Sequence, residues 1–174
     1  RRADLLRRGG EALSSEAEPA QCRVGDVLSD LRSLYARPLF EDRGIQLEIR
    51  VASGLPAVAM AASRLKQVLI NLFRNASEAL LPGGRLSVVV PGQLISNGVN
   101  CVEIRIIDNG PGLPRERLAQ LFSPSPSSKG GDHQGLGLHI VMDILQKSGA
   151  YILCRSQPGV GTSFQILVPV PESS

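Results

Sequence analysis

Aromatic residues are scarce in this chain of 174 residues: they make up 3% of it, and tryptophan is absent. Hydrophobic residues make up 43% of the chain, so a core must be built mostly from leucine, isoleucine, valine and alanine. Arginine and aromatic residues do not alternate anywhere, as they do in many surfaces that bind nucleic acid. We therefore expect one soluble globular domain that does not bind nucleic acid.

Cysteine, lysine and long apolar runs are also sparse. Cys22, Cys101 and Cys154 show neither zinc-ligand spacing nor a disulfide framework, which favours buried thiols in a reducing compartment. No apolar run is long enough for a membrane span and no secretory signal is present, so we expect a cytoplasmic fragment without direct membrane contact. The membrane status of the parent protein stays open. The net charge of +3 suits an anionic ligand.

The first 23 residues are polar and include "GGEALSSEAEPAQ", a composition typical of a linker. The chain also begins without an initiator methionine. We therefore expect residues 1–23 to be a linker or the end of an upstream dimerisation helix. Residues 24–172 are expected to form the domain itself.

The spacing of apolar residues divides this domain into helices and strands. Helices are predicted over residues 24–44, with Pro38 bending the helix, and over 63–81, 115–122 and 136–148. Strands are predicted over 45–51, 85–90, 101–108, 150–156 and 162–169, with a polar loop between the second and third and a hairpin between the last two. This order predicts a two-layer α/β (α+β) sandwich, a mixed sheet packed by helices on one face.

The two longest predicted helices each carry an apolar stripe that we expect to be buried. In the first, the stripe is Val27, Leu28, Leu31, Leu34, Tyr35 and Leu39. In the second, it is Leu65, Val68, Leu69, Leu72, Ala76, Ala79 and Leu80.

Asn71 and Asn75 lie four residues apart on the second helix, so they share one face, away from its apolar stripe. The oxygen of an asparagine there could ligate Mg²⁺, which prefers oxygen ligands and often shares them with phosphates. An ordinary solvated helix face would explain the pair equally well. The spacing by itself leaves both interpretations open.

Two glycine-containing stretches suggest contacts with a ligand. "DNGPG", residues 108–112, follows an apolar strand, so its carboxylate could accept a hydrogen bond from an amine such as that of adenine, although it is also good turn chemistry. "GLGL", residues 135–138, opens a helix, whose free N–H groups and dipole suit phosphate. The polar residues before it, "SSKGGDHQ", would then form a mobile cover.

Together these stretches resemble the ATP-binding catalytic domain of bacterial sensor histidine kinases, part of the GHKL clan that also contains DNA gyrase B, MutL and a heat-shock chaperone family. "NLFRNASEAL" resembles the N box, "DNGPGLP" the G1 box, "LFSPSPSSKG" the F box and "GLGLHIV" the G2 box. The resemblance covers about residues 24 to 170. It implies a Bergerat-type ATP-binding fold that uses ATP and Mg²⁺.

The resemblance also implies roles for the matching positions. Asn75 would hold the Mg²⁺ that bridges the ATP phosphates, and Asn71 would lie near the phosphate chain. Asp108 would bind the adenine amine, with Gly110 and Gly112 passing close to the base. Segment 122–134 would be the ATP lid. The other nucleotide-binding positions implied are Phe122, Lys129, Gly135, Leu136, Gly137 and Leu138, of which Lys129 would act with the two asparagines in catalysis.

Asn71 occupies the position where the ATP-hydrolysing members of the clan carry a glutamate base. An amide is not a useful general base, which favours transfer to a protein side chain. Neither His133 nor His139 has the setting of an acceptor histidine. The acceptor would then lie on upstream dimerisation helices, and a response regulator receiver domain would be the next partner.

Two departures from the family pattern stand out. Pro124 and Pro126 lie in "SPSPSS", where a second phenylalanine of the F box is usual. The aspartate usual just before the second helix is also missing, and "AMAAS" stands there instead. The unusual lid keeps an alternative open: a partner-binding module, or one that senses a regulatory nucleotide such as a cyclic dinucleotide. A GHKL ATPase is a further alternative.

Overall fold

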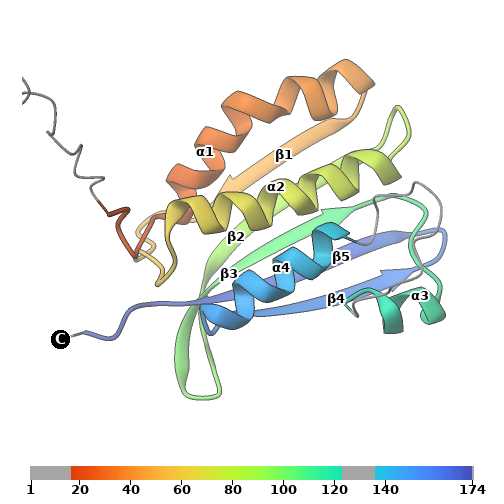
Figure 1. The fold of residues 1–174 in the computed structure, drawn as a ribbon. Helices are drawn as coiled ribbons and strands as arrows, with labels where there is room; N and C mark the ends of the chain where they lie inside the picture. The colour runs from red at the N-terminus through yellow and green to blue at the C-terminus, as the bar shows by residue number, and fades with distance from the viewer. Residues whose placement is uncertain (1–16, 123–135, 174) are drawn as a thin grey trace, which may run out of the picture.

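The computed structural model describes residues 17–122 and 136–173 and arranges them in two layers (Figure 1). Its helices are α1 (Val24–Tyr35), α2 (Ala62–Ala79), α3 (Arg115–Gln120) and α4 (Leu136–Lys147), with a π-helical turn η1 (Ala36–Phe40) and a 3-10 turn η2 (Glu41–Arg43) after α1. Its strands are β1 (Gln46–Val51), β2 (Arg85–Ser96), β3 (Val99–Asp108), β4 (Tyr151–Gln157) and β5 (Gly161–Pro169).

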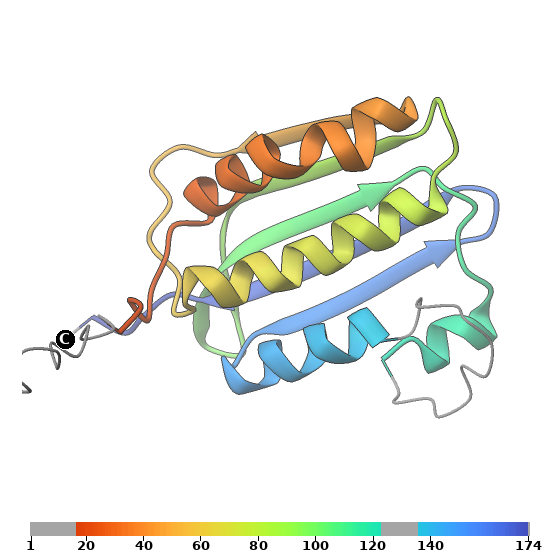
Figure 2. The same ribbon diagram turned by 45° about the horizontal axis from the view of Figure 1, so that its top comes forward.

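The five strands form one mixed sheet in the order β1-β2-β3-β5-β4. Strands β1 and β2 are parallel, and the other neighbouring pairs are antiparallel. A parallel pair needs a crossover connection, and α2 supplies it, so this helix lies across the sheet. Figure 2 shows α1, α2 and α4 side by side over one face of the sheet. The predicted two-layer sandwich is confirmed.

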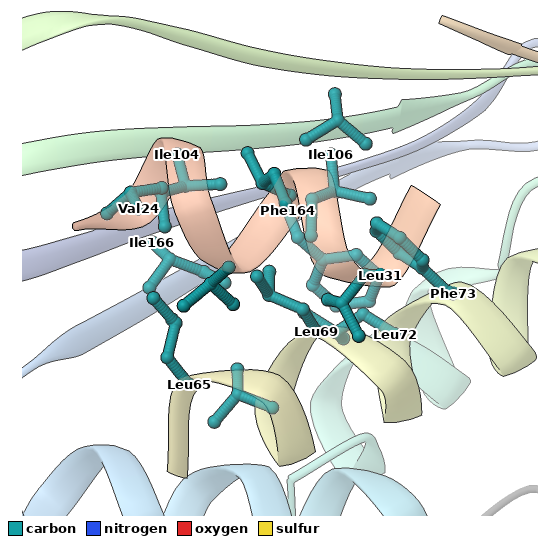
Figure 3. Close-up of a cluster of buried hydrophobic side chains, with 14 of the residues drawn as sticks. Val24, Leu31, Leu65, Leu69, Leu72, Phe73, Ile104, Ile106, Phe164 and Ile166 are labelled. Carbon is teal, nitrogen blue, oxygen red and sulfur yellow. The ribbon is translucent and has the colours of Figure 1, made fainter. Parts of the chain in front are cut away.

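The hydrophobic core lies between these helices and the sheet (Figure 3). Aliphatic side chains supply most of it, as the composition predicted. The side chains labelled in Figure 3 are Val24, Leu31, Leu65, Leu69, Leu72, Phe73, Ile104, Ile106, Phe164 and Ile166. Two of the few aromatic rings, Phe40 and Phe73, meet edge to face with their centroids 6.0 Å apart. This contact joins the segment after α1 to the middle of α2.

The buried side of α2 is broader than its apolar stripe predicted. Phe73 and Ser77 are buried as well, whereas Ala79 is exposed. The reason is that α2 is the middle helix, with contacts to α1 on one side and α4 on the other. On α1 the prediction was wrong for Leu34, whose side chain is 64% exposed, because α1 covers an outer part of the sheet and none of the described helices lies on its far side.

The helix predicted over residues 24–44 is α-helical only as far as Tyr35. Pro38 has no N–H group, so it cannot form the α-helical hydrogen bond to Leu34, and the chain widens into η1. Gly44, at φ 70°, then ends η2 in a left-handed conformation and turns the chain into β1.

Strands β2 and β3 form a long hairpin, so the polar loop predicted between them was wrong. The strands continue to Ser96 and from Val99, joined by the two residues Asn97 and Gly98. Both have positive φ, 50° and 78°, which matches the right-handed twist of the flanking strands. Pro91 lies where the register shifts between Val89 and Gly92. Proline has no N–H group to donate to a neighbouring strand, and at such an irregularity no donor is needed.

Candidate functional site

Asp108 is the last residue of β3, and its carboxylate is partly buried at the end of the sheet. It is paired with Leu86 and Thr162, which are both buried, so its side chain faces the helix layer. Oδ1 accepts hydrogen bonds from Gly110 N at 2.9 Å and Thr162 N at 3.4 Å. No described residue donates to Oδ2. Burial raises the pKa of Asp108, and the two backbone hydrogen bonds oppose that rise.

The glycines around Asp108 lie where the backbone approaches itself too closely for a side chain. A Cβ on Gly112, which has φ 72°, would lie 2.2 Å from the carbonyl oxygen of Gln157. A Cβ on Gly161 would lie 2.0 Å from the carbonyl oxygen of Asp108. The loop after β3 is therefore packed directly on the β4–β5 hairpin, and Gly159 N donates to Pro111 O at 2.8 Å.

Ser156 and Thr162 hold this loop and were missed by the sequence analysis as site residues. Ser156 Oγ accepts from Leu113 N at 2.7 Å and lies 2.8 Å from Thr162 Oγ1. The two residues are cross-strand partners on β4 and β5. The available signal was a hydroxyl residue on each strand, flanking the "QPGVG" turn. Thr162 also donates its backbone N–H to Asp108 Oδ1, so this pair of residues supports both the loop and the carboxylate.

Asn71 and Asn75 both lie half-buried on α2. Asn71 Nδ2 is shielded from solvent and has no hydrogen-bond partner among the residues that the structure describes. A buried donor without a partner costs free energy, so an acceptor from outside the described chain would stabilise it. The end of α2 adjoins the loop after β3, because a Cβ on Gly110 would lie 3.5 Å from Leu80 Cδ2 and 3.8 Å from Ala79 O.

The start of α4 lies at the same end of the molecule as the ends of α2 and β3 in both views (Figures 1 and 2). Leu136 and Gly137 belong to its first turn, and the Leu138 side chain is buried in the core. Phe122 is half-buried and packs against the same core. Lys129, Gly135 and the rest of the predicted lid lie outside the described residues.

Asn75 is the candidate for the predicted metal ligand. Among the residues that the structure describes, no group of three or more His, Cys, Asp or Glu could hold a metal ion. Mg²⁺ often uses one or two protein oxygens and completes its shell with water and substrate phosphates. The donor set of this site would thus suit Mg²⁺ as part of a complex with phosphate, for which the Asn75 amide oxygen is the candidate protein ligand.

The three cysteines are free thiols: Cys101 is buried, and Cys22 and Cys154 are half-buried. Burial, together with the negative charge of Asp108, raises the pKa of Cys154 to about 11. This thiol therefore stays protonated at neutral pH and is not a nucleophile.

A shallow cavity of about 520 Å³ lies behind Asp108, on the face of the sheet that the helices leave open. Its floor includes Ser87, Ile107 and Ser163, which are register neighbours pointing away from the core. Arg85 and Arg155 stand at its sides. Asp108, Ser156 and Thr162 also line this cavity, whereas neither Asn71 nor Asn75 does, so it shares the end of β3 with the site but not the asparagines of α2.

None of the described helices has both the length and the apolar content needed to cross a membrane.

Comparison with known proteins gives one consistent result. The sensor histidine kinase ZraS of Klebsiella oxytoca is 32% identical, and the match covers 98% of this chain and 37% of ZraS. The sensor kinase CckA of Brucella abortus is also 32% identical, over 87% of this chain and 17% of CckA. The chain thus spans less than half the length of these curated relatives.

Solved structures show the same fold. The catalytic domain of the histidine kinase ThkA superposes with a TM-score of 0.73 at 25% identity, covering 87% of this chain and 97% of that domain. Full-length ShkA, solved in complex with AMPPNP, superposes with a TM-score of 0.71 at 24% identity, covering 88% of this chain and 32% of ShkA. Residues 60–172 match the family described as histidine kinase-, DNA gyrase B- and HSP90-like ATPase, and the chain belongs to that family.

Proposed function

We propose that this chain is the ATP-binding catalytic domain of a sensor histidine kinase. The observation that supports this most directly is the buried amide nitrogen of Asn71, which has no partner within residues 17–122 and 136–173 and lies one turn from Asn75 on α2. The γ-phosphate end of a nucleotide would supply the missing acceptor. The family and the sensor-kinase relatives support the same function.

The adenine base would bind at the end of β3. Asp108 Oδ2 has no donor from the described residues, so it can accept from the exocyclic amine of adenine. Burial destabilises the charged form of this carboxyl and so raises its pKa, and a hydrogen-bond donor at Oδ2 would stabilise that charged form. Ser156 and Thr162 hold the surrounding backbone in place without needing to contact the base.

The phosphates would lie between α2 and the start of α4. The free amides of the first turn of α4 suit a phosphate, and Lys129 would add a positive charge from the lid. Asn75 would hold Mg²⁺ through its amide oxygen. When bound, the ion would neutralise phosphate charge. The asparagines of α2 would orient the terminal phosphate for in-line attack.

The reaction would be phosphoryl transfer to histidine. An imidazole nitrogen of an upstream dimerisation helix attacks the γ-phosphorus, and the bond from that phosphorus to the β-γ bridging oxygen breaks with its electron pair leaving on ADP. The product is a phosphoramidate, stable to base and labile to acid. A response regulator receiver domain would then accept the group. Asn71 cannot act as a general base toward water, so hydrolysis would be slow.

Calorimetric titration with ATP and Mg²⁺ tests the binding step. The chain should bind Mg-ATP and turn it over very slowly. Asn75→Ala should weaken Mg-ATP binding about tenfold or more while the fold persists, because a contact to a charged group is lost. Asn100→Ala is a matched control, since Asn100 is exposed on β3 and its side chain donates only to Gln93 among the described residues.

Three results would contradict the proposal. Unchanged Mg-ATP affinity in folded Asn75→Ala would remove the metal assignment. Fast ATP turnover by this chain alone would point to the ATPase branch of the family. A parent protein that binds Mg-ATP but never labels a histidine would point to a sensing module.

A further inference from the structure

Helix α2, which carries both asparagines of the site, has no cap of its own. Its N-cap residue is Ala61, which makes no side-chain hydrogen bond to the first turn. The first N–H groups of any helix lack partners within the helix, and a Ser, Thr, Asp or Asn side chain at the N-cap normally accepts from one of them. The sequence "AMAAS" supplies no such side chain at Ala61.

A carboxylate from far upstream takes the place of this cap. Glu18 Oε1 accepts from Ser63 N at 2.8 Å, and Glu18 Oε2 accepts from Ser63 Oγ at 2.5 Å, across 45 residues of chain. Ser63 is the second residue of α2, which is one of the positions that an N-cap side chain normally reaches. The negative charge also opposes the positive end of the helix dipole.

The segment that carries Glu18 is fastened beside the chain leading into α2. Cys22 and Val58 exchange two backbone hydrogen bonds, of 3.2 and 2.8 Å. Arg23 Nη1 donates to Leu55 O at 3.1 Å. Glu18 itself is exposed, and the hydrogen bonds from Ser63 lower its pKa, with Arg64 and Lys66 acting in the same direction. The contact between Glu18 and Ser63 therefore depends on residues 18–23 staying beside the chain that leads into α2.

We propose that Glu18 is a positioning residue that caps α2 from the upstream linker. The structural order of the first turns of α2, the helix that carries Asn71 and Asn75, then depends on whether the preceding chain is docked beside it. Asn71 lies eight residues beyond Ser63, about 12 Å along the helix at 1.5 Å per residue. Displacing the linker uncaps α2 and loosens its first turns. The consequence for nucleotide binding rests on the proposed function, whereas the cap itself does not.

Hydrogen exchange on the whole chain tests the cap with four variants: Glu18→Ala, Ala61→Asp, the two combined, and Glu41→Ala. Glu18→Ala should speed exchange of the amides of residues 62–65 about fivefold, the size typical of a lost N-cap. Ala61→Asp adds a local cap, so the combined variant should exchange at the original rate. Glu41→Ala removes an equally exposed carboxylate in η2, far along the chain from Ser63, and should leave these amides unchanged.

Mg-ATP affinity of the same variants tests the coupling. Glu18→Ala should bind about two- to threefold more weakly, and the combined variant should recover, because its α2 is capped without the linker. Unchanged exchange in Glu18→Ala, or no rescue by Ala61→Asp, would overturn the proposal. Faster exchange with unchanged affinity would overturn the coupling. If the unaltered chain bound no Mg-ATP, the proposed function would fail, and the exchange rates would still decide the cap.

Discussion

Asp108→Asn should weaken nucleotide binding and at the same time stabilise the unliganded domain. Oδ1 already accepts from Gly110 and Thr162, so the amide oxygen of an asparagine would take that position. The amide NH₂ would then replace Oδ2 and present donors where the adenine amine needs an acceptor. Loss of a hydrogen bond to a charged group costs about 1.5–3 kcal/mol, which corresponds to about a 10- to 150-fold weaker affinity.

The effect on stability has the opposite sign. The folded-state pKa of Asp108 is raised, so its contribution favours folding at pH below the ordinary aspartate range and is lost as pH rises through the raised pKa. At neutral pH the buried charge is therefore a cost, which a neutral amide removes. The melting temperature of Asp108→Asn should exceed that of the unaltered chain at pH 7, and the difference should shrink in acid.

Calorimetric titration with Mg-ATP and thermal unfolding across pH measure both quantities on the same samples. Asp42→Asn is the matched control, because Asp42 is exposed in η2 and, among the described residues, pairs only with the exposed Arg37 at 3.4 Å. If Asp108→Asn bound ATP as well as the unaltered chain, the adenine contact would be refuted. If affinity and melting temperature fell together, the loss would reflect damage to the fold.

Three further perturbations test other parts of the structure. Gly112→Ala should greatly weaken nucleotide binding and lower stability, as measured by calorimetry and thermal unfolding, because the new Cβ would lie 2.2 Å from Gln157 O. Gly54 also has a positive φ, but a Cβ there would meet nothing within 4 Å, so Gly54→Ala should lower the stability by only about 1 kcal/mol. Phe73→Ala should destabilise the domain by about 3–5 kcal/mol in urea unfolding, because this ring is 1% exposed. Glu18→Gln should lower the free energy of unfolding at pH values above the ordinary pKa of glutamate, where the charged cap is present. The difference from the unaltered chain should vanish as pH falls through the lowered pKa of Glu18. A pH-independent difference would contradict a charged cap.

The elements of this domain were largely predictable because each depends on neighbouring residues. The alternation over "IQLEIRV" has the two-residue period of a strand. The stripe of Leu65, Leu69 and Leu72 has the 3.6-residue period of a helix. The local backbone geometry imposes both periods. Errors arose where the surroundings decide. Ala79 is apolar yet exposed, and Ser77 is polar yet buried, since Ser77 Oγ donates to Leu39 O at 2.6 Å and accepts from Arg43.

By itself, the sequence determined the fold class and the ordered motifs that identify the family, including the four-residue spacing that puts Asn71 and Asn75 on one face of α2. Only the tertiary structure showed that the Asn71 amide nitrogen is buried without a partner in the described part of the chain, that Oδ1 of Asp108 accepts hydrogen bonds, and that Ser156 supports the loop after β3. It also revealed the cap that Glu18 provides. The hydrogen bonds Leu113–Ser156, Ser63–Glu18 and Thr162–Asp108 join residues 43 to 54 positions apart, so they depend on strand register and helix docking, which no local period encodes.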